Sequence, residues 1–186
     1  MSINILVTGA SRGIGAAILD RLDEASIRLV GHATLGDGDR LIAADFAQAD
    51  APAELWQAAL DRLDGRIDVL VNNAGIPAPL LEMQHRPAHW HYAASKAGMV
   101  AMTKTIARAY AAEGILAFAV CPGFTMTGMA EDYLASRGGD RLLADIPLGR
   151  VAKPAEVAET VRFLALSAPP SMTGAILDIN GASYVR

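Results

Sequence analysis

A glycine-rich turn near the start of the chain constrains its fold more than any other feature. The short apolar run Ile3–Val7 ends in Thr8-Gly9-Ala10-Ser11-Arg12-Gly13-Ile14-Gly15, after which apolar residues recur at four-residue spacing as far as Leu22. This order predicts a buried strand, a tight turn and an amphipathic helix. Glycines let the backbone approach a pyrophosphate closely, and the start of the following helix offers free N–H groups and a positive dipole end. The turn therefore predicts a dinucleotide-binding site.

The rest of the chain alternates between predicted strands and predicted helices. The strands are expected at 27–30, 40–44, 67–71, 115–120 and 175–179, and the helices at 52–63, 92–113 and 154–166, with a mixed segment at 125–143. Continuous apolar strands that alternate with helices indicate a parallel sheet covered on both faces. Because no repeat or linker interrupts this pattern, we expect residues 1–186 to form one doubly wound, Rossmann-like α/β domain.

Composition excludes several other classes of protein. Hydrophobic residues make up 52% and charged residues 19% of the 186 residues, and the net charge is −4. These values are typical of a globular domain and give no basic surface for nucleic acid or an anionic membrane. No uninterrupted apolar run approaches the ~20 residues that span a membrane, and no signal-peptide pattern is visible. We therefore expect a cytoplasmic protein without a nucleic-acid or membrane partner.

Three further motifs follow the glycine turn in a fixed order. Asn72-Asn73-Ala74-Gly75 ends the fourth predicted strand, Tyr92-Ala93-Ala94-Ser95-Lys96 opens the longest helix, and Pro122-Gly123-Phe124-Thr125-Met126-Thr127 follows the next strand. Together with the Gly-x-x-x-Gly-x-Gly turn, they resemble the short-chain dehydrogenase/reductase family over nearly the whole chain. The resemblance implies an enzyme that interconverts a small-molecule carbonyl and a secondary alcohol by hydride transfer with NADP(H) or NAD(H).

The same resemblance assigns residues to each part of the cofactor. It implies that the glycine turn holds the pyrophosphate, that the residues after the third strand flank the adenine, that the fourth-strand motif lines the adenosine, and that the Pro-Gly segment holds the nicotinamide. The pyrophosphate residues are Gly9, Ser11, Arg12, Gly13, Ile14 and Gly15, and the adenine residues are Asp45 and Phe46. The adenosine residues are Asn72, Ala74 and Gly75, and the nicotinamide residues are Pro122, Gly123, Thr125 and Thr127.

The end of the second strand favours NADP(H) over NAD(H). An NAD-binding domain of this type usually has an acid there for the ribose 2′-hydroxyl. This chain instead has Gly31-His32-Ala33, and no acid occurs before Asp37. Arg12 in the glycine turn can pair with a 2′-phosphate. His32 is either an additional cofactor contact or a polar surface residue.

Tyr92 and Lys96 are the predicted reacting pair. Residues four apart share one face of a helix. An ammonium group beside a phenol stabilises the phenolate and lowers its pKa, which suits the phenol for proton transfer near neutral pH. The resemblance also implies that Lys96 binds the nicotinamide ribose. Such pairs are common on surface helices, so a solvated pair is the alternative interpretation.

One interval is too short for the family pattern. The resemblance implies a helix and a central strand before Tyr92, which supply an asparagine and a serine of the active site. Only the sixteen residues 76–91 lie between Gly75 and Tyr92, and they include no Ser, Thr or Asn. A helix of ~11 residues and a strand of ~5 do not fit there. The strands on either side of the missing one must then pair directly or leave two unpaired edges.

Three accounts of this interval remain open. The chain is an incomplete record of a longer protein, or it has a true deletion that weakens or abolishes catalysis, or it is a functional short enzyme that uses another donor such as His89 or His91. The rival to the enzyme hypothesis is a noncatalytic nucleotide-binding or regulatory remnant of the same family. The resemblance implies a homo-oligomer, but the helix before Tyr92 that usually forms the interface is missing.

His85, His89 and His91 cluster in the same interval. A metal site is one interpretation of three neighbouring histidines. No cysteine and only Glu82 accompany them, so we predict a polar loop and no metal.

Overall fold

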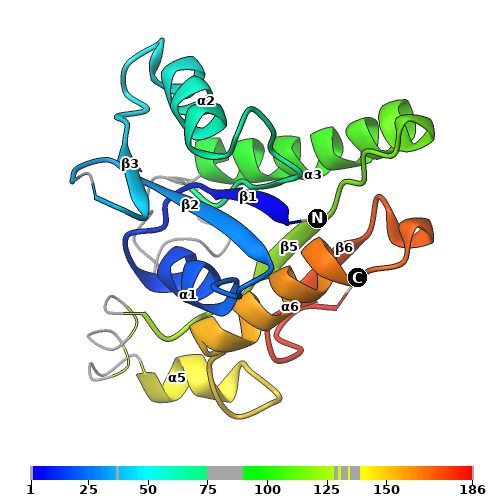
Figure 1. Cartoon of the computed structure of the whole chain (residues 1–186). Helices are drawn as coiled ribbons and strands as arrows, with labels where there is room; N and C mark the ends of the chain where they lie inside the picture. The colour runs from blue at the N-terminus through cyan, green and yellow to red at the C-terminus, as the bar shows by residue number, and fades with distance from the viewer. Residues whose placement is uncertain are drawn as a thin grey trace. The chain divides into compact units, whose positions relative to one another are not determined.

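The computed structural model describes residues 2–36, 38–74, 90–127, 130, 134 and 139–185, and from residue 93 onward the side chains of the long helix (Figure 1). These residues fall into two compact units. Unit 1 comprises Met1–Gly75 with Ala158–Ala165, and unit 2 comprises Ile76–Val157 with Leu166–Arg186. Within the described residues, no helix is long and apolar enough to cross a membrane.

Unit 1 is built on a four-stranded parallel sheet with the order β3-β2-β1-β4. The strands are β1 (Ile3–Val7), β2 (Ile27–Ala33), β3 (Leu41–Ala43) and β4 (Val69–Val71), and the helices between them are α1 (Gly13–Arg21) and α2 (Ala51–Arg62). The β1–β2 register runs from Ile3 opposite Ile27 to Val7 opposite Gly31. The predicted alternation of strands and helices around a parallel sheet is therefore confirmed in this half of the chain.

Helices cover both faces of this sheet. On one face, Leu6 and Val30 pack with Leu55, Ala59 and Leu63 of α2 and the turn that follows it. On the other face, Gly31 leaves room for α1: a Cβ there would lie 3.2 Å from the Leu19 Cδ1 atom. The alternation of side chains along β2 thus separates two apolar contacts, one with each helix.

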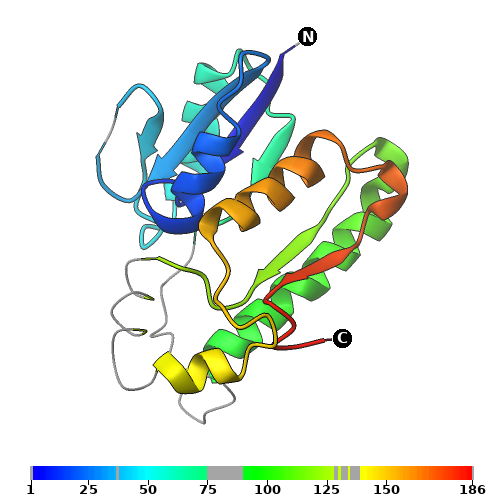
Figure 2. The same ribbon diagram turned by 90° about the horizontal axis from the view of Figure 1, so that it is seen from below.

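The middle of α6 (Pro154–Leu166) joins unit 1 beside α1, as Figures 1 and 2 show. Arg162 donates to Glu24 at 2.7 Å, and Arg21 pairs with both Glu24 and Glu159. The hydrogen bond from Arg162 holds the pKa of Glu24 below its ordinary value, and the hydrogen bond from Arg21 does the same for the pKa of Glu159. Four alternating charges therefore connect a C-terminal helix to the N-terminal half.

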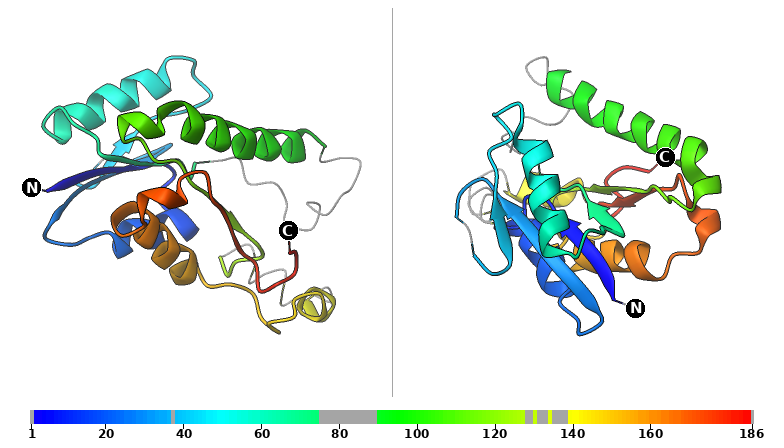
Figure 3. Two further views of the ribbon diagram at one scale, coloured as in Figure 1. Left: turned by 90° about the vertical axis from the view of Figure 1, so that its right-hand side faces the viewer. Right: turned by 45° about the horizontal axis from the view of Figure 1, so that its top comes forward.

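Unit 2 contains a two-stranded parallel ribbon of β5 (Ala119–Pro122) and β6 (Ile176–Ile179). The long helix α3 (Trp90–Tyr110) lies along this ribbon and continues into η3 (Ala111–Glu113), as Figure 3 shows. Gly114 ends the helix with a φ of +81°, as the sequence predicts. The remaining elements of unit 2 are α5 (Gly139–Ala144) and η4 (Pro170–Met172).

The sheet is interrupted at the predicted place. Among the described residues, β4 pairs only with β1, and β5 pairs only with β6. Within its own unit, each of these strands therefore has one described neighbour. β5 begins at Ala119, whereas the sequence predicts a strand from Ile115. The first part of this apolar run has no neighbouring strand, and Ala117 instead bonds to the turn at Thr173 and Gly174.

Candidate functional site

The glycine turn after β1 has no space for larger residues. Gly9 has a φ of +65°, and a Cβ on it would lie 2.8 Å from the Cα of Ala74. A Cβ on Gly15 would collide with the carbonyl oxygen of Gly9 and lie 2.6 Å from the Asn73 Nδ2 atom. The backbone of the turn, the first turn of α1 and the loop after β4 therefore approach one another too closely for a side chain at either glycine.

Two side chains fasten this turn to the loop after β4. The Thr8 Oγ1 atom accepts the N–H groups of Asn73 at 3.0 Å and Ala74 at 2.9 Å. The Asn73 Nδ2 group donates to the carbonyl oxygens of Thr8 at 3.0 Å and Gly9 at 3.1 Å. The predicted site residues omit Thr8 and Asn73, although both lie inside the motifs that carry the resemblance, and their positions there are the signal that could have identified them.

The start of α1 has the electrostatic character of an anion site. Arg12 is the N-cap residue, but its side chain makes no capping hydrogen bond, and the first turn of the helix contains no acid. Ser11 and Arg12 are exposed. The N–H groups at the start of the helix thus have no competing carboxylate, and Arg12 adds a positive charge beside them.

The predicted adenine and adenosine residues lie at the carboxyl ends of strands of one sheet in unit 1, after its two edge strands β3 and β4. Asp45 and Phe46 follow β3 and are exposed, and Asn72 follows β4 and is exposed. The Asp45 Oδ1 atom accepts the N–H of Ala47 at 3.0 Å, which fixes the direction of this turn. Thr34 is exposed immediately after β2, where an NAD-binding domain usually has an acid.

His32 is buried beside the glycine turn. It is only 3% exposed, so the interpretation as a polar surface residue is wrong. Its Nδ1 atom accepts the N–H of Gly9 at 3.1 Å, and its Nε2 atom lies 2.8 Å from the carbonyl oxygen of Ala44. Both ring nitrogens are thus used within the protein, which leaves neither for direct contact with a 2′-phosphate.

The predicted reacting pair lies on α3, in unit 2. Tyr92 and Lys96 are both helical, four residues apart, as the sequence predicts, and Lys96 is exposed. The side chains of Tyr92 and His91 lie outside the described residues, as do Gly75, His85 and His89. Across the residues that the structure describes, no group of three metal-binding side chains occurs.

The predicted nicotinamide residues also belong to unit 2. Pro122 ends β5, and the Gly123 N–H continues the ribbon by donating to Ile179 at 3.0 Å. Thr125 is buried and its hydroxyl donates to the carbonyl oxygen of Gly123 at 3.0 Å, while Thr127 is half-buried. The structure therefore places the residues predicted for the pyrophosphate and adenine in unit 1, and those predicted for the nicotinamide and the proton transfer in unit 2.

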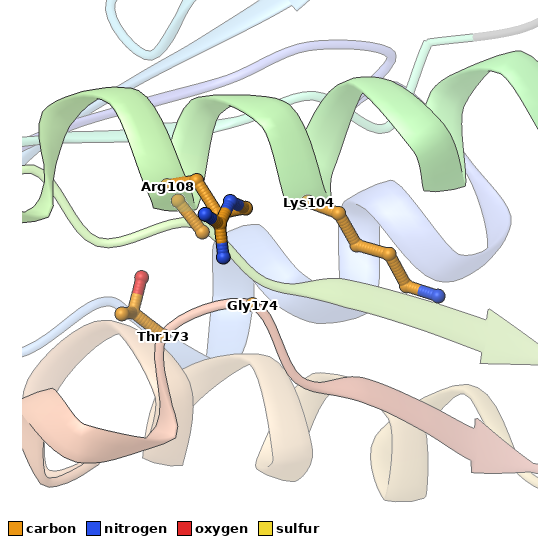
Figure 4. Close-up of a pocket in the computed structure, with 5 residues that line it drawn as sticks. Lys104, Arg108, Thr173 and Gly174 are labelled. Carbon is orange, nitrogen blue, oxygen red and sulfur yellow. The ribbon is translucent and has the colours of Figure 1, made fainter.

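One hollow of about 330 Å³ lies on unit 2 between α3 and the turn before β6 (Figure 4). Lys104, Ala107 and Arg108 line it from the helix, and Thr173 and Gly174 line it from the turn. None of the predicted cofactor or reacting residues lines this hollow. It is therefore separate from the site that the motifs predict.

Comparisons with known proteins agree with the motifs. The family model "short chain dehydrogenase" matches residues 4–90, and the family model "Enoyl-(Acyl carrier protein) reductase" matches residues 81–182. A 3-oxoacyl-[acyl-carrier-protein] reductase of Vibrio cholerae is 30% identical, with 97% of this chain and 96% of that protein covered. An acetoacetyl-CoA reductase of Rhizobium meliloti is also 30% identical, with 99% of each chain covered. A crystal structure of an actinorhodin polyketide ketoreductase variant with NADPH superposes with a TM-score of 0.82 at 26% identity, covering 98% of this chain and 97% of that one.

The relatives are longer than this chain inside the matched region. The alignment with the Vibrio cholerae protein extends over 237 positions, whereas this chain has 186 residues. The difference means that at least 51 residues of that relative have no counterpart here. A helix of ~11 residues, a strand of ~5 and their loops fit within that length.

Proposed function

Because the chain belongs to the short-chain dehydrogenase/reductase family, we propose that it is an oxidoreductase that uses NADP(H) to interconvert the carbonyl of a 3-oxoacyl thioester and the corresponding secondary alcohol. The observation that carries the proposal is the glycine turn, where the backbone at Gly9 and Gly15 excludes any side chain and the start of α1 has neither cap nor acid. This cradle fits a pyrophosphate. The names of the two curated relatives supply the substrate class.

The choice of NADP(H) rests on charge. The exposed Arg12 lies beside the helix start, and the residues after β2 begin with Thr34 instead of an acid. A guanidinium forms strong, charge-assisted hydrogen bonds with a phosphate, whereas a carboxylate at this place would repel it. Gly9, Gly13 and Gly15 would hold the pyrophosphate, Asp45 and Phe46 the adenine, and Asn72, Ala74 and Gly75 the adenosine. Pro122, Gly123, Thr125 and Thr127 would hold the nicotinamide.

The reacting pair supplies the proton. When bound, the nicotinamide cofactor supplies or accepts the hydride. The Tyr92 phenol would donate a proton to the carbonyl oxygen in reduction and accept one from the alcohol in oxidation. The Lys96 ammonium group would stabilise the phenolate form and bind the ribose. The serine and asparagine that assist this pair in the family have no counterpart in residues 76–91, so Tyr92 would bind the substrate oxygen with less help.

The proposal is tested with purified protein, NADPH and acetoacetyl-CoA as the probe substrate. Tyr92→Phe should lower kcat by about 10²- to 10⁴-fold, because it removes the proton donor. The Kd for NADPH should change by less than about twofold, since the phenyl ring remains. Tyr110→Phe is the matched control, because this tyrosine lies on the same helix and is 45% exposed. A wild-type protein that does not bind NADPH would refute the proposal.

The interrupted sheet favours a second candidate, a noncatalytic nucleotide-binding remnant. β4 and β5 are unpaired with each other, and at least 51 residues of the Vibrio cholerae relative have no counterpart. NADPH binding without turnover of any 3-oxoacyl thioester would favour this candidate. Intact mass decides the related question: a mass well above 19.5 kDa would mean that the protein contains a further segment.

The remaining expectations are part of the same proposal. We expect a cytoplasmic homo-oligomer that acts on a small molecule. The usual pairing helix has no space in residues 76–91, so any oligomer would use another surface. Size-exclusion chromatography with light scattering measures the oligomeric state directly.

A further inference from the structure

A histidine that the proposed chemistry does not use lies at the centre of the candidate nucleotide site. His32 is buried in β2, the strand between β1 and β3. A backbone N–H can only donate, so the Nδ1 atom that meets the Gly9 N–H at 3.1 Å must accept. The proton then resides on Nε2, which donates to the carbonyl oxygen of Ala44 at 2.8 Å. The hydrogen bonds thereby specify a neutral ring in one tautomer.

These two bonds reach two different loops. Gly9 lies in the pyrophosphate turn after β1, and Ala44 directly precedes Asp45 and Phe46 after β3. The His32 ring also stacks on Phe46, with ring centroids 4.4 Å apart and an interplanar angle of 18°. One side chain therefore contacts both the turn proposed for the pyrophosphate and the residues proposed for the adenine.

The geometry of the turn explains why this contact matters. Gly9 adopts a positive φ, and its carbonyl oxygen is held from the opposite side by Asn73. The neighbouring Ala10 N–H donates to the His32 carbonyl oxygen at 2.7 Å, so β2 holds two successive N–H groups of the turn. Without an acceptor at Nδ1, the Gly9 N–H would lose its partner and the turn could reorient.

Phe46 lies at the other end of the set of contacts that His32 makes. One face of its ring lies on His32, and the side chain is still 42% exposed. The exposed part of this residue is available to a planar ligand. The Nε2–Ala44 bond fixes the backbone immediately before this residue. Movement of the histidine ring would thus move the Phe46 ring and the Gly9 turn together.

We propose that His32 is a positioning residue for nucleotide binding, which holds the Gly9 turn and the Phe46 wall at the separation required by an adenine-linked pyrophosphate. This role rests on the proposed function and adds to it a residue that does not touch the ligand. Its effect should be seen only with ligands that contact both ends. 2′,5′-ADP carries phosphates for the turn and an adenine for the wall, whereas adenosine has the adenine and no phosphate.

Three variants at this position separate the contacts. His32→Phe keeps a ring against Phe46 and removes both hydrogen bonds. His32→Asn keeps an acceptor near the Nδ1 position, and His32→Gln keeps a donor near the Nε2 position. Because His32→Phe releases both the Gly9 turn and the backbone before Phe46, it should raise the Kd for 2′,5′-ADP by about tenfold or more. His32→Asn should recover much of this affinity, and the Kd for adenosine should change by less than about threefold.

Asn4 provides the matched control for removing the hydrogen bonds of a buried polar side chain. It is a buried polar residue of β1, and it donates to the carbonyl oxygens of Leu63 at 2.7 Å and Arg66 at 2.9 Å. Asn4→Ala should lower the thermal midpoint and leave the Kd for 2′,5′-ADP within about twofold of wild type. A purely structural histidine would behave in the same way, so a His32→Phe variant with a lower midpoint and an unchanged Kd would overturn the proposal.

Further outcomes keep the two proposals distinguishable. If wild type binds 2′,5′-ADP and His32→Asn is no better than His32→Phe, the positioning role is wrong and the proposed function stands. If wild type binds neither 2′,5′-ADP nor NADPH, both the positioning role and the proposed function are wrong. If His32→Phe does not fold, the comparison of His32→Asn with His32→Gln decides, because only the former retains the Gly9 contact. In ¹⁵N NMR of wild type, a protonated Nδ1 at neutral pH would also overturn the proposal.

Discussion

The two compact units differ in how completely their strands are paired and buried. In unit 1, β1 has a neighbour on each side, and among the described residues six of the seven largest fully buried side chains belong to this unit. In unit 2, every residue of β5 and β6 is at least partly exposed, and each strand pairs only with the other. Unit 1 is therefore more completely packed than unit 2, which carries Tyr92 and Lys96.

This difference separates binding from catalysis. The proposed pyrophosphate and adenine contacts come from the loops of the four-stranded sheet, and their geometry is held by Thr8, His32 and Asn73. The proposed reacting pair lies on a helix along a two-stranded ribbon. β4 shows the same deficit at its edge, because Leu70 is 49% exposed. We infer that the chain retains what a nucleotide needs and lacks part of what fixes the substrate.

Restoring the missing segment should have the largest effect. We would replace residues 76–91 with the corresponding longer segment of the Vibrio cholerae relative, which supplies a strand for the β4 and β5 edges. One preorganised donor to a developing oxyanion contributes about 10²- to 10³-fold, so kcat with acetoacetyl-CoA should rise by at least that factor. The Kd for NADPH should change little, because unit 1 is unaltered.

A flexible Gly-Ser insertion of the same length is the control for this replacement. It relieves any strain in the connection but provides neither the strand nor the donor. Equal turnover by the two insertions, or by the short chain and the replacement, would show that unit 2 is catalytically complete as it stands.

Equivalent core truncations should affect stability unequally in the two units. Leu6 of β1 is almost fully buried against α2, whereas Leu177 of β6 is half-buried. Leu6→Ala should lower the free energy of unfolding by about 2–5 kcal/mol, and Leu177→Ala by less than about half of that, because it removes less buried surface and leaves a smaller cavity. Urea unfolding followed by circular dichroism measures both. Equal losses would mean that unit 2 is as tightly packed as unit 1.

The elements that the sequence predicts best are those that depend least on distant neighbours. The ranges of β1 and α6 agree with the prediction at both ends. Apolar spacing and a proline at the helix start are local signals, so they suffice for these two elements. The start of β5 is wrong by four residues because a strand also needs a partner, and the run from Ile115 lacks one on the side of the missing segment.

The site shows the same limit. The glycine turn follows from the sequence because its spacing specifies the backbone itself. The role of His32 does not follow, because Gly31-His32-Ala33 has no apolar pattern and the predicted strand ends before it, although β2 continues to Ala33. Only the positions of Gly9, Ala44 and Phe46 around the ring account for a buried polar residue there. Such a contact depends on two separate loops and has no local signal.

The ion pairs between α1 and α6 should matter less than the core. Arg162→Met removes the bond to Glu24 and should make the α6 amides exchange faster with solvent, with a smaller fall in the thermal midpoint than Leu6→Ala causes. Arg66→Met is the control, since Arg66 pairs with Asp68 only two residues away and joins no second helix. High salt should reduce the difference between wild type and Arg162→Met, because exposed charges are screened. No change in α6 exchange would show that apolar contacts alone hold this helix.

The smallest effect should come from the start of α6, which belongs to unit 2. Arg150 donates to both carboxylate oxygens of Glu156 at 2.8 Å, and the Lys153 N–H donates to Glu156 at 2.7 Å. These bonds lower the pKa of Glu156 from 4.5 to about 2. A lowered folded-state pKa contributes stability that is complete above the unfolded value and disappears as the pH falls from about 4.5 towards about 2.

Glu156→Gln should therefore lower the thermal midpoint slightly at pH 6, because the amide keeps the volume of the side chain and loses its charge. The two proteins should converge as the pH approaches the folded-state value. Glu54→Gln is the matched control, because Glu54 also lies in the first turn of a helix, α2 in unit 1. A difference between wild type and Glu156→Gln that stays constant from pH 6 to pH 3 would show that geometry, and not charge, fixes the start of α6. The start of α6 in unit 2 would then depend on contacts that are independent of charge, as the packed core of unit 1 does.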